Sequence, residues 1–319
     1  GYEQNTFIQN LLQRVSFPFE VADIENVISM YNIGTVKNGY RKGAVTFPFI
    51  DIKGNIRAIQ VKQFNNDNHT TGTDFIHSII EKHYIKNSKQ LPQWLTDYKD
   101  NDIKVSCLFG EHLLTKHNKP VALVEAPKTA IYGTLYLPGF VWLAVYNLSS
   151  LNVQKCLSLK GRDVYLFPDL SPDGAAFKLW SDKAKEIEKA INARFVVSDL
   201  LETIAPAEEK QKGYDLADYL IKFDWRLFRT KLFTPIPEPT PLNVDYYHDL
   251  KYFDSSINVD GEPLYDFIRS RVHDVREHHS NAAYQELILL QKELFKNKAM
   301  PKPSRVSTSL PAHSLVMAN

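Results

Sequence analysis

The sequence predicts two packed units, an α+β unit followed by an α/β unit with a mostly parallel sheet. Short, continuously apolar runs recur from residue 120 onward, and amphipathic stretches with helical spacing separate them. Such runs are typical of strands buried on both faces, and their alternation with helices favours a parallel sheet. The chain of 319 residues is also longer than one small domain requires.

The first hundred residues show mixed periodicity. Residues 3–14 and 22–30 place apolar side chains on one helical face, which predicts two helices. Residues 44–52 and 55–64 alternate apolar with polar side chains around the turn signal Lys53-Gly54, which predicts a hairpin.

Two polar segments lie in the rest of this first unit. Residues 66–74 are expected to form a loop because they are polar throughout. Residues 86–102, around Trp94, are expected to be an irregular excursion over the surface.

The second unit alternates predicted strands with predicted helices. The strands are expected at 121–125, 141–145, 163–167 and 195–197, and the helices at 128–137, 175–192 and 215–223. Sequential strands joined by helices pair in parallel, with right-handed crossovers.

A proline at every second position of residues 234–242 predicts a stiff linker, because proline fixes φ and removes a hydrogen-bond donor. Leucines beyond it are spaced for one helical face. The expected division is an α+β subdomain at 1–106, the α/β domain at 107–230, the linker at 231–243, a helical region at 244–300 and a disordered tail at 301–319.

Composition excludes several classes of protein. Lys and Arg number 38 against 37 Asp and Glu, so the chain as a whole has no basic field that would attract nucleic acid. The two cysteines, Cys107 and Cys156, are too few for a four-cysteine zinc site, and we expect no zinc. Because no apolar run reaches 18 residues and no export signal starts the chain, we expect a cytoplasmic protein without membrane contact.

Acidic residues follow two of the predicted buried strands. Glu125 ends the run VALVE, and Asp169 comes just after the run VYLF. In an open parallel sheet, ligands bind at the carboxyl ends of the strands, so both carboxylates would project from one edge. Such a pair suits Mg²⁺, which prefers one or two carboxylates plus water and phosphate oxygens. The alternative is that each acid simply lies at the start of a helix, where the helix dipole favours it.

The order of these motifs resembles the TOPRIM domain of bacterial primases and type IA topoisomerases. The resemblance is carried by VALVEAPKTA (121–130), AVYNLSSLN (144–152) and VYLFPDLSPDG (164–174). It implies a Rossmann-like fold in which Glu125, Asp169 and Lys128 are catalytic, and in which Glu125 and Asp169 hold Mg²⁺ or Mn²⁺ with Ser171 and Asp173 as helpers. GYDLADYL (213–220) resembles a segment of mobile-element primases and implies that Asp215 and Asp218 lie near the site.

The resemblance also extends upstream of this domain. TFPFIDIKGNIRAIQVK (46–62) resembles the strand pair in the N-terminal subdomain of the primase catalytic core, and LFGEHLL (108–114) resembles the connection into the TOPRIM strand. As a whole, residues 30–220 are similar to TOPRIM-like proteins of bacterial mobile elements. This implies single-stranded DNA and nucleotides as partners, a replicative helicase as a further partner, and a zinc ribbon that commonly precedes the core.

Three positions depart from the family's pattern. The second acid of the Asp-x-Asp motif is Ser171, the glycine after the first acid is Ala126, and a usual aspartate is Thr129. Losing a carboxylate weakens the grip on Mg²⁺ that phosphoryl chemistry requires.

Basic residues concentrate in one stretch of the first unit. Between residues 37 and 62 there are six basic side chains and one acid, Asp51. This pattern favours a surface that tracks a nucleic-acid backbone. The alternative is a solvated strand edge on which lysines prevent aggregation. The candidate DNA-binding residues are Lys37, Arg41, Lys42, Arg57 and Lys62.

The leading hypothesis is a primase-like enzyme that performs template-directed nucleotidyl transfer on single-stranded DNA in mobile-element replication. The first alternative is a nucleic-acid-binding module whose TOPRIM site has lost catalysis, as Ser171 suggests. The second is a TOPRIM nuclease, which the primase-like segment 46–62 argues against.

Overall fold

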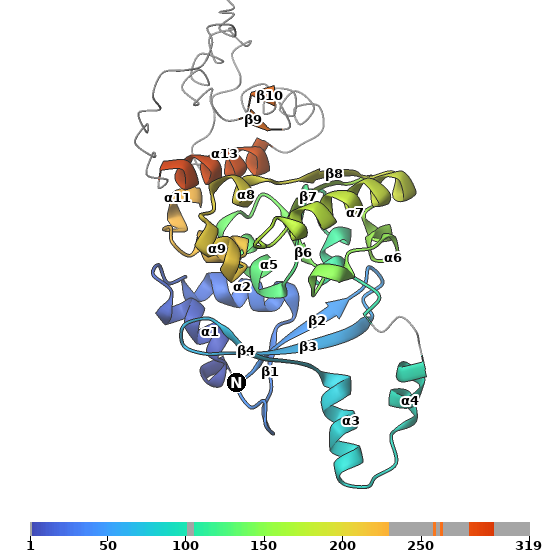
Figure 1. Cartoon of the computed structure of the whole chain (residues 1–319). Coiled ribbons are helices and arrows are strands. Elements are labelled where there is room, and N and C mark those ends of the chain that lie inside the picture. The colour runs from blue at the N-terminus through green and yellow to red at the C-terminus, as the bar shows by residue number, and fades with distance from the viewer. Residues whose placement is uncertain (1, 101–104, 230–257, 260–261, 264–280, 297–319) are drawn as a thin grey trace, which may run out of the picture.

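The computed structural model describes residues 2–100, 105–229, 258–259, 262–263 and 281–296 (Figure 1). The predicted linker 231–243, the predicted tail 301–319 and most of the predicted helical region 244–300 lie outside the described residues. The predicted domain boundaries therefore remain predictions.

The chain begins with short helical pieces. These are the 3₁₀ turn Tyr2–Gln4, α1 (Thr6–Gln9), a π-helical turn at Asn10–Arg14, and α2 (Val21–Tyr31). The side chain of Asn5 accepts a hydrogen bond from the Ile8 N–H at 3.2 Å and so caps α1. The predicted helix at 3–14 is thus divided into three segments, whereas the predicted helix at 22–30 is confirmed.

A four-stranded antiparallel sheet follows, in the order β1-β2-β3-β4. Its strands are β1 (Gly34–Thr35), β2 (Val45–Ile50), β3 (Ile56–Phe64) and β4 (Thr70–Phe75). The predicted hairpin is confirmed as β2–β3. The loop predicted at 66–74 is wrong over β4, because β-branched threonines suit a strand once β3 supplies its hydrogen-bonding edge.

Two helices project from this sheet. They are α3 (Ile76–Lys86) and α4 (Gln93–Asp100), and Figure 1 shows them extending away from the rest of the molecule. The segment 86–102, predicted to be irregular, therefore contains a helix with Leu95 buried on its inner face.

The second sheet is parallel and four-stranded, in the order β6-β5-β7-β8. Its strands are β5 (Val121–Val124), β6 (Val141–Ala144), β7 (Asp163–Phe167) and β8 (Arg194–Val197). All four predicted strands and their parallel pairing are confirmed. Because Val124 of β5 is in register with Phe167 of β7, the ends of these two neighbouring strands lie side by side.

Helical segments connect and cover the parallel strands. Between Glu111 and Ile191 they are η3 (Glu111–Thr115), α5 (Pro127–Tyr136), η4 (Leu148–Ser150), α6 (Val153–Cys156), η5 (Leu157–Leu159) and α7 (Ala175–Ile191). After β8 come α8 (Leu200–Ile204), α9 (Ala207–Lys212), α10 (Leu216–Leu220), α11 (Arg226–Arg229), the two-residue strands β9 (Asn258–Val259) and β10 (Glu262–Pro263), and α13 (Asn281–Lys296). Helix α5 packs against β6, and α7 packs against β8. Within the described ranges, no helix has the length and apolarity needed to cross a membrane.

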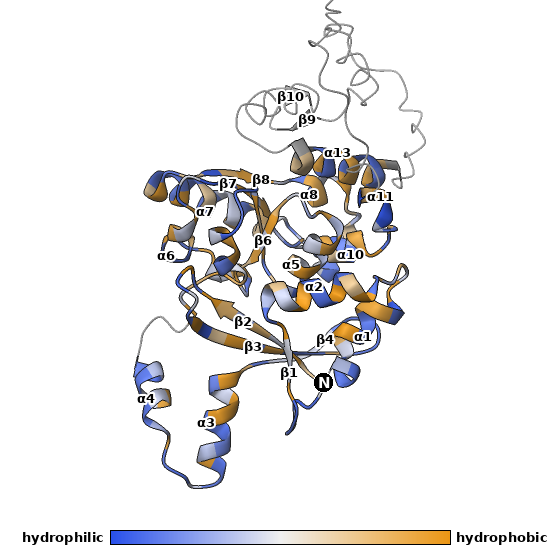
Figure 2. Cartoon of the chain, turned by 180° about the vertical axis from the view of Figure 1, so that it is seen from behind, coloured by the Kyte–Doolittle hydropathy of each residue, from blue (hydrophilic) through white to orange (hydrophobic). Residues whose placement is uncertain are grey.

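One continuous hydrophobic core joins the two sheets. Strands β2 and β6 are largely apolar (Figure 2), and all four residues of β6 are buried. The fully buried ring of Trp142 stacks on Phe167, with centroids 5.6 Å apart, and lies against Gly133 of α5. A Cβ at Gly133 would lie 2.3 Å from this ring, so the glycine allows helix and strand to approach closely.

Helix α13 is anchored to the loop before β6 by a buried carboxylate. Both oxygens of Glu286 lie within hydrogen-bond distance of the Gly139 N–H, at 2.7 and 2.8 Å. Burial raises the pKa of Glu286 to about 8, against the opposing effect of this hydrogen bond. Gly139 has no room for a side chain, since a Cβ would lie 2.8 Å from the Ala283 backbone.

Replacing this carboxyl should therefore change how stability depends on pH. The raised folded-state pKa means that the Glu286 contribution is complete below about pH 4.5 and is lost as the pH rises towards 8. In wild type this group should lower the free energy of unfolding by up to about 1.4 kcal/mol per pH unit over that window. We expect Glu286→Gln not to show this decrease. Urea unfolding of wild type and variant between pH 5 and 8 measures the difference, and exposed Glu186→Gln is the control. A difference that does not grow with pH would contradict this expectation.

Candidate functional site

Glu125 and Asp169 lie at the carboxyl edge of the parallel sheet, as predicted. Glu125 is the residue directly after β5, and Asp169 is two residues beyond β7. Because Val124 of β5 pairs with Phe167 of β7, both acids lie beyond the same end of the sheet, with Asp169 one residue further along than Glu125. The Leu148 N–H of η4 donates a hydrogen bond to the Glu125 carboxylate.

Lys62 reaches the same place from the other sheet. It lies on β3 between its partners Val45 of β2 and Thr73 of β4. Its ammonium group interacts electrostatically with Lys128, Asp215, Asp169 and Glu125, and burial together with the Lys128 charge lowers its pKa. Within the described ranges, Lys62 forms no ion pair.

The segment around Asp215 closes the cluster. Asp215 caps α10, and α10 packs against α5. Lys128 Nζ lies 3.1 Å from Asp215 Oδ2 and 3.5 Å from Asp218 Oδ1. Thr129 Oγ1 donates to Asp215 Oδ2 at 2.8 Å. The prediction that Asp215 and Asp218 lie near Glu125, Asp169 and Lys128 agrees with these positions.

We call these six ionisable residues the acidic cluster: Lys62, Glu125, Lys128, Asp169, Asp215 and Asp218. Burial would lower the pKa of Lys128, but the charges of Asp215 and Asp218 outweigh it and raise that pKa. Burial would likewise raise the pKa of Asp215, but Lys128 and the Thr129 hydroxyl hold it below its ordinary value. Lys128 thus compensates Asp215, whereas burial and the Asp215 charge raise the pKa of Asp218 despite Lys128.

The pKa values of the other two acids are raised as well. Burial, followed by the charges of Asp215 and Glu125, raises the pKa of Asp169 well above its usual range. Burial also raises the pKa of Glu125, although the Lys62 charge and the Leu148 N–H oppose this. Asp169 Oδ1 is buried without a hydrogen-bond partner, which is unusual for a carboxylate oxygen.

The residues at this edge of the parallel sheet provide some of the ligands that a divalent cation needs. Among the residues that the structure describes, no group of three or more His, Cys, Asp or Glu side chains is arranged to hold a metal ion. Mg²⁺, however, is commonly held by one or two carboxylates together with water and substrate phosphates. The Glu125 carboxylate and the Asp169 oxygen that lacks a hydrogen-bond partner provide two such ligands.

Ser171 and Asp173 are engaged at the start of α7. Ser171 Oγ accepts a hydrogen bond from the Ala176 N–H at 3.0 Å, and Asp173 Oδ1 accepts one from the Ala175 N–H at 3.1 Å. Asp173 is exposed to solvent. The structure thus gives these two predicted metal ligands capping hydrogen bonds.

The candidate DNA-binding residues are divided among different environments. Lys37 and Lys42 are exposed, whereas Lys62 belongs to the acidic cluster. Arg41 forms an ion pair with Asp74 at 2.8 Å. Arg57 forms an ion pair with Asp51.

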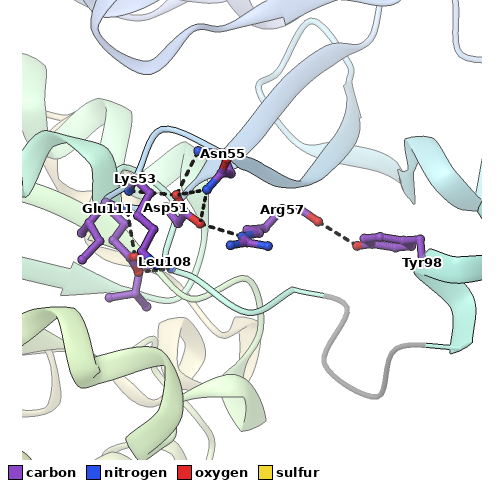
Figure 3. A network of polar contacts seen from close by, with 8 residues as sticks. Asp51, Lys53, Asn55, Arg57, Tyr98, Leu108 and Glu111 are labelled. Atoms are coloured by element: carbon purple, nitrogen blue, oxygen red, sulfur yellow. Dashed lines mark hydrogen bonds and ion pairs between the residues drawn. The ribbon is translucent and has the colours of Figure 1, made fainter. Parts of the chain in front are cut away.

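Asp51, the one acidic residue between positions 37 and 62, holds the β2–β3 turn together through hydrogen bonds. It accepts hydrogen bonds from the backbone N–H groups of Lys53 and Asn55, both at 2.9 Å, and pairs with Arg57 Nε at 2.6 Å (Figure 3). These bonds hold the pKa of Asp51 at about 2 despite the opposing effect of burial. The neighbouring Glu111 accepts from the N–H groups of Ile52 and Leu108, so carboxylates fix this end of the hairpin.

Thr129 was missed as a member of the site. It stands where the TOPRIM pattern has an aspartate, and its fully buried hydroxyl orients Asp215. The sequence feature that could have predicted its role is its position on the first turn of α5, four residues after Glu125 and next to Lys128.

Comparison with known proteins gives one sequence-family match. A family model described as "Domain of unknown function (DUF6371)" matches residues 5–170. No curated protein sequence matches the chain.

Several solved structures of primases are similar to this one at low sequence identity. A DnaG primase catalytic domain bound to ssDNA is 15% identical, with 93% of this chain and 97% of that chain covered and a TM-score of 0.41. The DnaG catalytic core is 14% identical, with coverages of 92% and 96% and a TM-score of 0.38. The primase fragment of the bacteriophage T7 primase-helicase protein is 15% identical over 58% of this chain, with a TM-score of 0.35, and this chain spans 63% of that fragment's length.

Proposed function

We propose that this chain, which belongs to the family described as a domain of unknown function (DUF6371), performs template-directed nucleotidyl transfer on single-stranded DNA. The family description assigns no activity, so the residues of the site support this proposal. The observation that supports this most is the meeting of Glu125 and Asp169 at one strand edge with Lys62 from the other sheet. Carboxylates beside a lysine suit a divalent cation and a triphosphate. We further propose that the reaction makes primers for a mobile element.

In the proposed reaction a 3′-hydroxyl attacks the α-phosphorus of a nucleoside triphosphate, and pyrophosphate leaves. Glu125 accepts the proton of the attacking hydroxyl, a role that suits a carboxyl whose pKa burial raises above its ordinary value. A Mg²⁺ or Mn²⁺ ion, held by Glu125 and Asp169, would neutralise charge on the phosphates.

Two lysines have different roles in this proposal. Lys62, whose ammonium forms no ion pair with another described residue, binds an oxygen of the triphosphate. Lys128, which is engaged by Asp215 and Asp218, orients the cluster from α5. Exposed Lys37 and Lys42 are the remaining candidates for contacts to the DNA backbone.

Primer synthesis with Glu125→Gln tests this proposal. Wild type, given a single-stranded template, nucleoside triphosphates and Mg²⁺ or Mn²⁺, should make product, and the variant should fall at least about 100-fold because general-base catalysis contributes that much. The matched control is Glu208→Gln, an exposed carboxyl on α9. Unchanged synthesis by Glu125→Gln would falsify the proposal.

The capping hydrogen bonds of Ser171 and Asp173 favour one alternative, a nucleic-acid-binding module without catalysis. If these residues serve only α7, the site has fewer acidic ligands than the TOPRIM pattern. This alternative predicts that wild type makes no product and that single-stranded DNA binding falls with salt but ignores Mg²⁺.

A further inference from the structure

The acidic cluster already contains an internal cation between two of its carboxylates. Lys128 Nζ contacts Asp215 Oδ2 and Asp218 Oδ1 at 3.1 and 3.5 Å, and only 13% of the Lys128 side chain is exposed. A primary ammonium ion is a compact point charge, so it can occupy a position between two carboxylates much as a metal ion does.

Every carboxylate oxygen of this aspartate pair has a partner within the protein. Asp215 Oδ1 accepts the Asp218 N–H at 3.0 Å, and Asp218 Oδ2 accepts the Asp215 N–H at 2.9 Å. Asp215 Oδ2 takes the Thr129 hydroxyl and Lys128, and Asp218 Oδ1 takes Lys128. A metal ion could bind this pair only by displacing one of these contacts.

The opposite half of the cluster is different. Asp169 Oδ1 is buried and accepts no hydrogen bond, so a cation could bind it without displacing a contact, unlike the oxygens of the α10 aspartates. With four carboxylates and two ammonium groups, the cluster carries two net negative charges when all six groups are ionised. One divalent cation neutralises that charge, whereas a second would leave two buried positive charges uncompensated.

We propose that Lys128 takes the place of a second metal ion, so that this chain binds one divalent cation, at Glu125 and Asp169, rather than the pair used in two-metal phosphoryl transfer. The inference rests on the proposed function, which assigns the metal to Glu125 and Asp169. Lys128 supplies a fixed positive charge on the far side of the cluster, and Thr129 together with the α10 cap holds its two aspartates in place.

Calorimetric titration with Mn²⁺ tests this on the full chain. Wild type should bind one equivalent at the cluster, and Lys128→Met, whose unbranched side chain is one atom shorter and uncharged, should bind two. Electron paramagnetic resonance of the same samples should show an isolated Mn²⁺ ion in wild type. In the variant it should show a coupled pair, because metals in two-metal sites lie about 3.5–4 Å apart. Lys212→Met, at an exposed lysine paired with Glu208, is the control and should bind one.

The outcomes separate this inference from the function on which it rests. Two ions in wild type, with a coupled spectrum, would overturn the inference and leave a metal-dependent function standing. No Mn²⁺ bound to wild type would overturn both the inference and the metal role in the proposed function. A folded Lys128→Met that binds only one ion would overturn the inference. If circular dichroism shows that Lys128→Met does not fold, the wild-type stoichiometry and spectrum still decide.

Discussion

Asp169→Asn is expected to weaken Mn²⁺ binding by at least about 100-fold while making the metal-free protein more stable. Metal affinity falls because the variant loses one of two charged ligands, and even outer-shell changes at metal sites cost about 10–100-fold. Stability rises because Asp169 is a buried acid whose pKa burial and the neighbouring Asp215 and Glu125 raise well above its usual range. At neutral pH its ionised form opposes folding.

Two measurements on the same protein check this pair of opposite effects. Calorimetry gives the Mn²⁺ affinity, and urea unfolding in chelator gives the free energy of unfolding, for which we expect a gain of about 1–2 kcal/mol. Asp182→Asn on α7 is the control for removing one negative charge. Unchanged Mn²⁺ affinity in Asp169→Asn would show that the metal is held elsewhere, and a loss of stability would show that this carboxylate has a structural partner.

Asp215→Ala is expected to destabilise the protein by about 3–5 kcal/mol, the range for breaking a buried ion pair by removing one partner. Three groups lose their acceptor at once: the Lys128 ammonium, the buried Thr129 hydroxyl and the Asp218 N–H at the start of α10. Lys128 would keep only the longer contact to Asp218.

Urea unfolding at pH 7 measures this loss. The matched control is Glu208→Ala, which removes a carboxylate from the exposed ion pair with Lys212 at 2.7 Å. That change should have a much smaller effect, because exposed ion pairs contribute little to stability. A small effect of Asp215→Ala would mean that water or Asp218 compensates Lys128, and it would weaken the case for Lys128 as a fixed internal cation.

The parallel sheet and one edge of the candidate site were predictable because their signals are local. Each of β5 and β7 is a short apolar run buried over its last four residues and ends one or two residues before its acid. Once these strands pair in parallel, Glu125 and Asp169 must lie at the same edge of the sheet. A short apolar run followed by an acid, all within about ten residues, is therefore enough to predict their position. The β2–β3 hairpin was predictable for the same reason, from alternation around a glycine turn.

Contacts between distant segments decided what local pattern could not show. β4 is a strand because β3 offers it a hydrogen-bonding edge, although its threonines read as a polar loop. Lys62 enters the acidic cluster, and Arg41 is paired with Asp74, although both belonged to the same predicted basic surface.

The acids at the strand ends follow from residue order alone, whereas the packing of distant elements sets which charges lie beside them. Lys128 and Asp215 are 87 positions apart in the chain, and only the packing of α10 on α5 brings them to 3.1 Å. Asp169 Oδ1, two residues beyond β7, is buried without a hydrogen-bond partner. Charge compensation in a buried site depends on distance and desolvation, which sequence spacing does not encode across separate elements.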